Sequence, residues 1–248
     1  MASGDNDLSR EADRRNREMF EEAMEAILAA WNNERFSFTG KHFSFPPPGI
    51  PDRGSTVKDL TLVPKPRGPV DVYQAVSSPR TLEYVASMGF RGVFANAHPS
   101  KTAPKWEEFG EVAAQHGHHW ERGDGRVLVI GTHVGRTREE AFRTGRNGHD
   151  EYCRFLAPYG RFAGYLGVER ESAIGYQPTL EESVEQQIMA IGSVDDVVDT
   201  IGMWRDLLSV RHLCLFFDFP GLTREQMDEQ LHLFAEEVLP RLGVRLGG

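Results

Sequence analysis

Cysteine is scarce in this sequence, whose 248 residues hold only two, Cys153 and Cys214. The two lie far apart and lack the close spacing typical of metal ligands, so we expect no metal site built on them. Cys214 falls within an apolar strand pattern, where a free cysteine behaves as a small hydrophobe. We therefore expect Cys214 to be a buried free thiol.

Long apolar runs are also absent. No run approaches the roughly 20 residues that are needed to cross a bilayer. The N-terminal stretch MASGDNDLSREADRRNREMF is polar and lacks the apolar segment of a signal peptide. We therefore expect a cytoplasmic protein that has no membrane partner.

Basic charge is in the minority, with 28 Lys and Arg against 37 Asp and Glu and a net charge of -9. A nucleic-acid surface needs a basic stripe, which the sequence does not show, so we expect no nucleic-acid partner. The chain also lacks a Gly-x-Gly-x-x-Gly fingerprint, a P-loop and a Gly-x-Ser-x-Gly elbow. Nothing therefore supports a nicotinamide site, a nucleoside triphosphate site or a serine nucleophile of that type.

The composition is that of an ordinary globular protein, with 40% hydrophobic and 26% charged residues, and the chain is long enough for a full-sized core. Near the N-terminus, apolar residues at helical spacing predict a helix over 10–31, and residues 1–13 are expected to form a flexible segment. The stretch RFSFTGKHFSF alternates apolar and polar residues around a turn and predicts a β-hairpin. Residues 46–66, rich in proline and glycine, predict a connector.

From residue 70 onward, strand patterns alternate with helix patterns. The predicted strands are 70–75, 90–97, 126–134 and 212–219, and the predicted helices are 79–88, 105–116, 138–156, 180–189, 194–208 and 224–242. Such alternation predicts a parallel sheet with right-handed crossovers. Four units are half of what a closed (β/α)8 barrel requires. We therefore predict an α/β fold that is a partial (β/α)8 TIM barrel, about its C-terminal half, with a β-hairpin insertion and extra helices before the last strand.

The first strand-to-helix joint reads Ser77, Ser78, Pro79, Arg80, Thr81. Ser78 is a good N-cap and Pro79 fits the first helical position, so plain capping explains the joint. A helix start also gathers free backbone N–H groups, which is a common way to hold a phosphate. The residues alone leave both interpretations open.

Three polar residues follow or end other strands and would face the catalytic rim of a barrel: Asn96, His133 and Asp218. His133 has the chemistry of an acid, a base or a hydrogen-bond donor, although a structural histidine is the commoner case. Asp218 suits either a cap of the next turn or a place in a substrate cavity.

The run HGHHW brings His116, His118 and His119 close together in sequence. Imidazole is a common metal ligand. No carboxylate or cysteine of fitting spacing accompanies the run, and it lies where a helix is expected to end. A solvated loop is therefore the expectation, and no metal is predicted.

Four stretches together resemble one family. They are MFEEAMEAILAAWNNERFSFTGKHFSF, SSPRTLEYVASMGFRGVF, AIGSVDDVVDTIGMWRDL and LCLFFDFPGLTREQMDEQLHLFAEEVLPRL. In order and content the chain is similar to the C-terminal part of the bacterial luciferase-like, flavin-dependent monooxygenases. The resemblance covers nearly all of the chain from about residue 14, as a single luciferase-like domain over 1–248.

The resemblance implies a function and a site. It implies that reduced FMN, supplied by a separate flavin reductase, and dioxygen oxygenate a small organic substrate, with the deazaflavin F420 as the other cofactor of the family. It places Ser77, Ser78, Arg80 and Thr81 at the flavin phosphate. Asn96, His133 and Asp218 would then surround the reacting end.

The chain departs from the family pattern because the first four βα units are missing from it. Those units supply much of the flavin pocket, and a half barrel exposes sheet edges and apolar interior. We expect a homodimer or a second chain that completes the barrel. The alternative is a truncated, inactive member that serves as a flavin-binding or structural subunit.

Overall fold

The computed structural model describes residues 3–95 and 97–244, with side-chain burial given from residue 11 onward. The chain divides into two compact units, residues 1–70 and residues 71–248. The single luciferase-like domain over the whole chain stays a prediction. Among the described residues, no helix is both long and apolar enough to cross a membrane.

Unit 1 begins with helix α1, Ser3–Asn32. The flexible segment expected over 1–13 is therefore helical from Ser3 onward, and the helix starts earlier than the apolar spacing predicted. Apolar spacing misses this part because its residues are polar. Arg14 instead pairs with Glu11 (2.7 Å) and with Glu18 (3.8 Å), one turn away on either side.

The predicted hairpin follows, with β1 (Phe38–Thr39) antiparallel to β2 (Ser44–Phe45). A second short hairpin, β3 (Pro51–Asp52) with β4 (Ser55–Thr56), lies in the stretch that was expected to be a plain connector. The sequence around it, PPPGIPDRGST, shows none of the alternation that predicted the first hairpin.

Glu22 of α1 holds the turn of the first hairpin. Its carboxylate accepts hydrogen bonds from the backbone N–H groups of Lys41 (3.0 Å), His42 (2.8 Å) and Phe43 (2.7 Å). Gly40 leaves room for this approach, because a Cβ there would lie 2.1 Å from Glu22 Oε1. The helix and hairpin of the stretch from 19 to 45 thus form one hydrogen-bonded piece.

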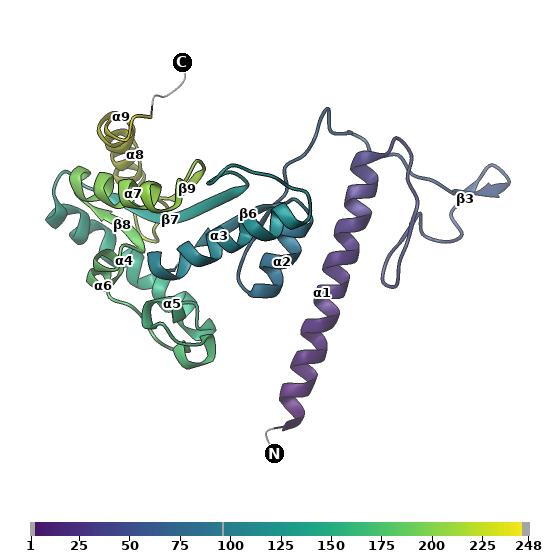
Figure 1. Ribbon diagram of the computed structural model, residues 1–248, viewed down its shortest axis with the longest axis horizontal. Helices are drawn as coiled ribbons and strands as arrows, with labels where there is room; N and C mark the ends of the chain where they lie inside the picture. Colours follow the sequence, from purple (N-terminus) through teal and green to yellow (C-terminus); the bar gives the residue numbers. More distant parts are fainter. Residues whose placement is uncertain (1–2, 96, 245–248) are drawn as a thin grey trace. The chain divides into compact units, whose positions relative to one another are not determined.

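Unit 2 is built on a parallel sheet of five strands: β5 (Tyr73–Ala75), β6 (Arg91–Ala95), β7 (Arg126–Val134), β8 (Met189–Gly192) and β9 (Leu213–Phe216). The order is β5-β6-β7-β8, and β9 also pairs with β7. Figure 1 shows β6 to β9 gathered beside one another with helices around them. The α/β class with a parallel sheet is as the sequence predicted.

The helical elements of unit 2 connect these strands. They are α2 (Pro79–Ser87), α3 (Pro99–Gln115), α4 (Arg138–Leu156), η1 (Ala157–Tyr159), α5 (Ala163–Leu166), η2 (Arg170–Ala173), α6 (Leu180–Glu185), α7 (Val194–Leu208), α8 (Arg224–Leu233), the π-helix η3 (Phe234–Val238) and α9 (Leu239–Arg241). Helix α3 packs on α2 and α7, α2 on β6, and α7 on β7 and β8. Helix α4 packs on β7, β8 and α6.

Strand β8 corrects the predicted count of four strands. Its four residues are all buried and lie between two capping boxes, at Thr179 and Ser193. A buried run this short has no periodicity that distinguishes it from the end of a helix. The sequence therefore predicted one helix over 180–189, whereas the helix ends at Glu185 and the strand begins at Met189. Helix α3 also starts at Pro99, six residues before its predicted start.

Cys214 is exposed, so the expected buried thiol is wrong. The strand that holds it is largely open, with Leu213 and Phe216 37% and 41% exposed. Leu213 and Cys214 point to opposite faces of the strand, so β9 is open on both faces, which apolar sequence alone does not show. Cys153, by contrast, is buried, and burial raises the pKa of its thiol to about 12.

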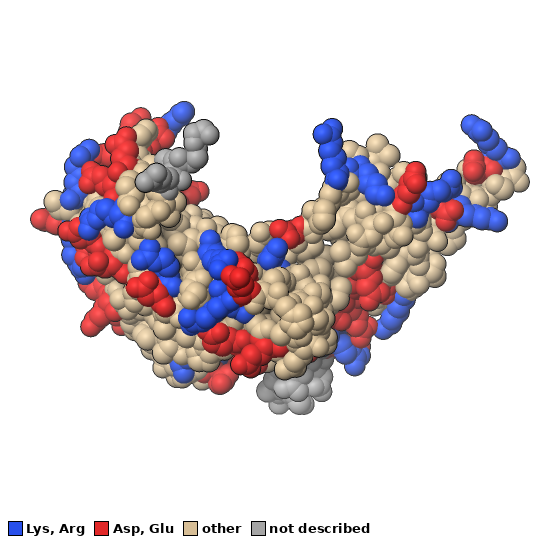
Figure 2. All heavy atoms as spheres, turned by 45° about the horizontal axis from the view of Figure 1, so that its top comes forward, with Lys and Arg blue, Asp and Glu red and all other residues tan. Residues whose placement is uncertain are grey.

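On the face shown in Figure 2, acidic and basic side chains are intermixed. The basic side chains of the described residues do not gather into one stripe on that face. This distribution agrees with a chain in which acidic residues outnumber basic ones.

Two glycines inside α4 set how closely this helix packs. A Cβ at Gly145 would lie 2.8 Å from the His133 ring, and one at Gly148 would lie 2.4 Å from Phe219 Cβ and 2.9 Å from the Pro220 carbonyl oxygen. Glycine inside a helix costs about 1 kcal/mol relative to alanine. Close packing against the end of β7 and the turn after β9 explains why α4 has glycine at these two positions despite that cost.

We predict that Gly148→Ala and Gly202→Ala change stability in opposite directions. Gly202 lies in α7, where an added Cβ would have nothing within 4 Å, so alanine there should raise the free energy of unfolding by about 0.5–1 kcal/mol. Gly148→Ala should lower it by about 1–3 kcal/mol through overpacking. Urea unfolding measures both, and a stabilising Gly148→Ala would contradict the packing described.

Candidate functional site

The candidate site lies at the carboxyl edge of the sheet. Strands β5, β6 and β7 are parallel, so their carboxyl ends meet at one edge. Each is followed by a helix, α2, α3 or α4, whose N-terminus begins there. This is the edge at which parallel α/β folds bind ligands.

At the end of β5, Ser78 and Thr81 form a reciprocal capping box on α2. Ser78 Oγ accepts from the Thr81 backbone N–H (3.2 Å), and Thr81 Oγ1 accepts from the Ser78 backbone N–H (2.8 Å). Thr81 Oγ1 also accepts from the Ser77 backbone N–H (3.2 Å). The capping interpretation of this joint is confirmed.

The same joint remains open to solvent. Ser77, Ser78 and Arg80 are exposed, and Thr81 is half-buried. A helix start with exposed hydroxyls and a neighbouring guanidinium has the donors that a phosphate requires. The cap therefore leaves the phosphate interpretation as a prediction.

At the end of β6, Asn96 lies outside the described residues. His98, two positions later, caps α3 by accepting from the Ser100 backbone N–H through Nδ1 (3.1 Å). The Nδ1 atom of His98 is therefore used in capping the helix.

At the end of β7, His133 is almost fully buried, with 2% of its surface exposed. Its Nε2 lies 2.8 Å from Thr144 Oγ1 on α4, and Thr144 Oγ1 donates to the Glu140 carbonyl oxygen (2.9 Å). With the hydroxyl donating to that carbonyl, the ring donates from Nε2, and this is the tautomer that we infer. In the neutral ring, Nδ1 then carries a lone pair.

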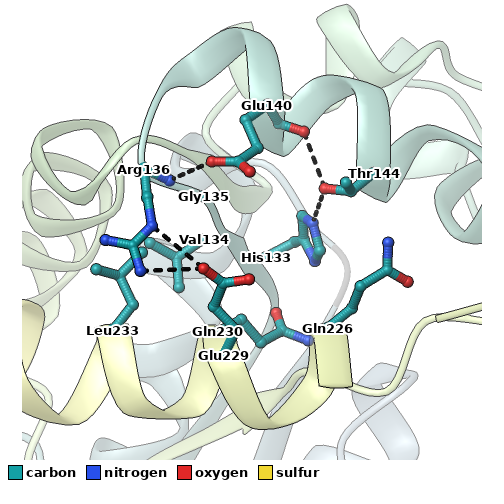
Figure 3. Close-up of a pocket in the computed structure, with 10 residues that line it drawn as sticks. All are labelled: His133, Val134, Gly135, Arg136, Glu140, Thr144, Gln226, Glu229, Gln230 and Leu233. Carbon is teal, nitrogen blue, oxygen red and sulfur yellow. Dashed lines mark hydrogen bonds and ion pairs between the residues drawn. The ribbon is translucent and has the colours of Figure 1, made fainter. Parts of the chain in front are cut away.

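His133 borders a cavity between the end of β7, the start of α4 and α8, shown in Figure 3. It is lined by His133, Val134, Gly135, Arg136, Glu140, Thr144, Gln226, Glu229, Gln230 and Leu233. Arg136 donates to Glu229 from Nε (3.2 Å) and Nη2 (3.1 Å), and its backbone N–H donates to Glu140 Oε2 (3.0 Å). One guanidinium and two carboxylates thus surround the cavity.

Burial lowers the pKa of His133, and the Gln230 side chain and the charge of Glu140 only partly oppose this. The ring is therefore neutral near pH 7. A neutral imidazole with a free lone pair accepts a hydrogen bond or a proton.

Asp218 lies elsewhere. It is exposed, two residues beyond the end of β9, and it does not line this cavity. Its two neighbours in the sequence contact the residues beside the cavity, Phe217 through the Gln230 amide and Phe219 through the His133 ring. The residues that sequence reasoning missed are Thr144, Gln230 and Arg136, because no local motif marks them.

The histidine run packs onto its surroundings. His116 Nε2 lies 3.3 Å from Glu83 Oε1, and His118 Nε2 lies 3.1 Å from the Ser87 carbonyl oxygen. His118 also stacks on Trp120. Among the described residues, no three His, Cys, Asp or Glu side chains are placed to hold a metal ion.

A second, apolar cavity lies on β7. It is lined by Val129, Gly131, Tyr152, Met189, Phe216 and Phe219. Phe219 also packs against His133, with ring centroids 6.1 Å apart. The contact between His133, which lines the first cavity, and Phe219, which lines the second, thus connects the two.

Comparison with known proteins gives one family. Residues 4–210 match the family model of the luciferase-like monooxygenases. The 4-hydroxyprotoasukamycin monooxygenase of Streptomyces nodosus subsp. asukaensis is 27% identical over 146 residues, which are 59% of this chain and 38% of that protein.

Two solved structures share the fold. One is the oxygenating constituent of 3,6-diketocamphane monooxygenase from the CAM plasmid of Pseudomonas putida, a type II Baeyer-Villiger monooxygenase in complex with FMN (TM-score 0.66, 19% identity, 91% of this chain and 63% of that chain). The other is an F420-dependent secondary alcohol dehydrogenase in complex with an F420-acetone adduct (TM-score 0.55, 17% identity, 89% and 60%). The chain spans about three fifths of each.

We predict that two buried histidines make stability fall on the acid side. His149, fully buried, lies 2.8 Å from Ser183 Oγ and 2.9 Å from Asp150 Oδ1, and burial lowers its pKa as it does that of His133. Below about pH 6.5 the unfolded chain binds protons that the folded chain does not, so the free energy of unfolding should fall by up to about 1.4 kcal/mol per pH unit for each ring.

Urea unfolding between pH 8 and pH 5 measures this slope. His149→Gln should flatten it, whereas the same change at the exposed His119 should leave it unchanged. An equal slope in wild type and His149→Gln would contradict the role of burial. Glu181, whose pKa Arg146 lowers to about 2, contributes only at lower pH.

Proposed function

The chain belongs to the luciferase-like monooxygenase family, and on that premise we propose that it oxygenates a small organic substrate with reduced FMN and dioxygen. The observation that carries the proposal is the exposed α2 N-terminus at the carboxyl edge of the sheet. A relative of the same fold was solved in complex with FMN, which supports this choice of cofactor.

The α2 N-terminus is the proposed binding site of the flavin phosphate. Ser77, Ser78 and Thr81 supply hydroxyls, the start of the helix supplies positive dipole, and Arg80 supplies charge. Pro79 at the first helical position has no N–H to donate, so the hydroxyls and later N–H groups carry the binding.

His133, Asn96 and Asp218 are proposed to act at the reacting end. His133 accepts a proton or a hydrogen bond at Nδ1, and burial keeps its ring neutral for that role. Asn96 is proposed to orient substrate from the end of β6, and Asp218 from beyond β9. Reduced flavin, when bound, supplies the electrons that activate dioxygen. The apolar cavity on β7 is proposed to exclude water beside it.

The proposal includes partners. A separate flavin reductase supplies the reduced cofactor, since no nicotinamide motif is present. A second copy or another chain completes the partial TIM barrel and covers the open faces of β9. The deazaflavin F420 is the alternative cofactor, in keeping with the solved dehydrogenase of the same fold. The cytoplasm is the expected compartment.

A non-catalytic subunit is the second candidate. The observation that favours it is the capping box, in which the Ser78 and Thr81 hydroxyls already satisfy one another (2.8 Å). Hydroxyls that already form hydrogen bonds within the helix cap should bind a phosphate weakly. Oxygen uptake with reduced FMN and a reductase separates this candidate from the enzyme.

We predict that Ser78→Asp weakens FMN binding and leaves stability intact. Aspartate caps a helix as well as serine does, so the free energy of unfolding should stay within about 0.5 kcal/mol. Its carboxylate should repel the phosphate and weaken FMN binding by about tenfold or more. A titration that follows quenching of flavin fluorescence measures binding, and riboflavin, which lacks the phosphate, should be unaffected.

The matched control is Ser209→Asp. It adds the same charge where α7 leads into β9, at the opposite edge of the sheet, and there Arg122 donates to Ser209 Oγ (3.0 Å). FMN binding should equal that of the wild type. Equal FMN affinity in Ser78→Asp and wild type would refute phosphate binding at the α2 N-terminus and leave this segment as a helix cap only.

A further inference from the structure

Two buried hydrogen-bond acceptors without partners border the cavity beside His133. They are His133 Nδ1 and Gln230 Oε1, and each belongs to a side chain that is only 2% exposed. A buried polar atom left without a partner costs about 1–3 kcal/mol. Folded proteins therefore satisfy nearly all such atoms, by protein, water or ligand.

Both atoms are acceptors, and their own side chains cannot satisfy them. Thr144 Oγ1 lies 2.8 Å from His133 Nε2 and 2.9 Å from the Glu140 carbonyl oxygen, and a hydroxyl that donates to this carbonyl places the His133 proton on Nε2. The Gln230 amide nitrogen donates to the Phe217 carbonyl oxygen (3.3 Å) and contacts Met227 Sδ (3.3 Å), which fixes Oε1 as the atom left over. The cavity thus presents two lone pairs and lacks a donor.

The cavity has room for one small group. Its volume of about 30 Å³ exceeds the roughly 10–15 Å³ that one water molecule needs. Figure 3 shows His133 and Gln230 on facing elements, β7 and α8, with the Arg136–Glu229 pair beside them. Two carboxylates and one guanidinium line the cavity, so the surrounding charge favours a neutral or cationic occupant over an anion.

We propose that this cavity binds a single atom that carries two or more donor hydrogens and bridges His133 Nδ1 and Gln230 Oε1. That chemistry has two sources, a water molecule or the primary ammonium end of an amine. A hydroxyl of an alcohol has one donor hydrogen and satisfies only one of the two acceptors. An occupant held at Nδ1 lies where a neutral imidazole takes up a proton.

The inference rests on the proposed function only in placing His133 at the reacting end. Its geometry is separate from the α2 N-terminus, and its readout is separate from flavin binding. A failure of FMN binding in the Ser78 experiment leaves the cavity unaffected, and the reverse also holds.

The test is ¹⁵N NMR of the histidine rings in the full chain, with the His133 signals assigned from the spectrum of His133→Gln. We expect an Nε2–H tautomer with an unprotonated Nδ1 at pH 8. Ammonium chloride is then titrated at constant ionic strength against tetramethylammonium chloride, which carries no donor hydrogen. A saturable shift of His133 Nδ1 with ammonium alone assigns the amine source.

Without such a shift, a cross-peak between long-lived bound water and the His133 ring assigns water as the occupant. Gln230→Leu should weaken the ammonium response about tenfold, as expected for one lost hydrogen bond to a charged donor, or remove the water cross-peak. Gln115→Leu, at an exposed glutamine of α3, should change neither.

The proposal is overturned if Nδ1 carries the proton, because a direct Nδ1–H bond to Gln230 Oε1 would leave neither atom free to accept a hydrogen bond from an occupant. It is equally overturned if His133 shows neither an ammonium shift nor a bound water. The tautomer is read in the wild-type protein, so this part of the test does not depend on any variant folding.

Discussion

Strand β7 is the constraint on which unit 2 depends, because its nine residues pair with three other strands. Its first half pairs with β6, its middle with β9 and its last four residues with β8. The helices on the sheet take their places from these pairings, α7 against β7 and β8 and α4 against the same two strands. The carboxyl end of β7, where His133 lies, is therefore held from several directions at once.

The close approach of α4 to this end turns a buried histidine into a site. Gly145 lets the helix backbone come against the His133 ring, and that approach brings Thr144 within hydrogen-bond distance. Thr144 in turn decides which ring nitrogen holds the proton. A larger residue at position 145 would move the helix away from the ring. His133 would then lose its hydrogen bond to Thr144.

The two parts of the candidate site differ in how they are stabilised. The α2 N-terminus is exposed and its hydrogen bonds are local, so it can hold a ligand without a buried group being left unsatisfied. The cavity beside His133 presents two buried acceptor atoms that lack partners, and these make an occupant energetically favourable. At the α2 N-terminus, helix capping and ligand binding use the same groups. In the cavity beside His133, a ligand would supply the hydrogen-bond partner that the protein lacks.

The sequence by itself determined the features that depend on neighbours a few residues apart. It placed β7 over 126–134, the start of α4 after residue 137 and the N-cap at Ser78, since these follow from hydrophobic runs and from the residue types preferred at helix starts. The family resemblance also came from continuous stretches. Tertiary structure alone decided that β8 is a strand, that Cys214 is exposed and that Gln230 faces His133 across 97 positions of sequence. Burial and partnership at such separations depend on which elements pack together, and the residues next to each position in the chain carry no record of that packing.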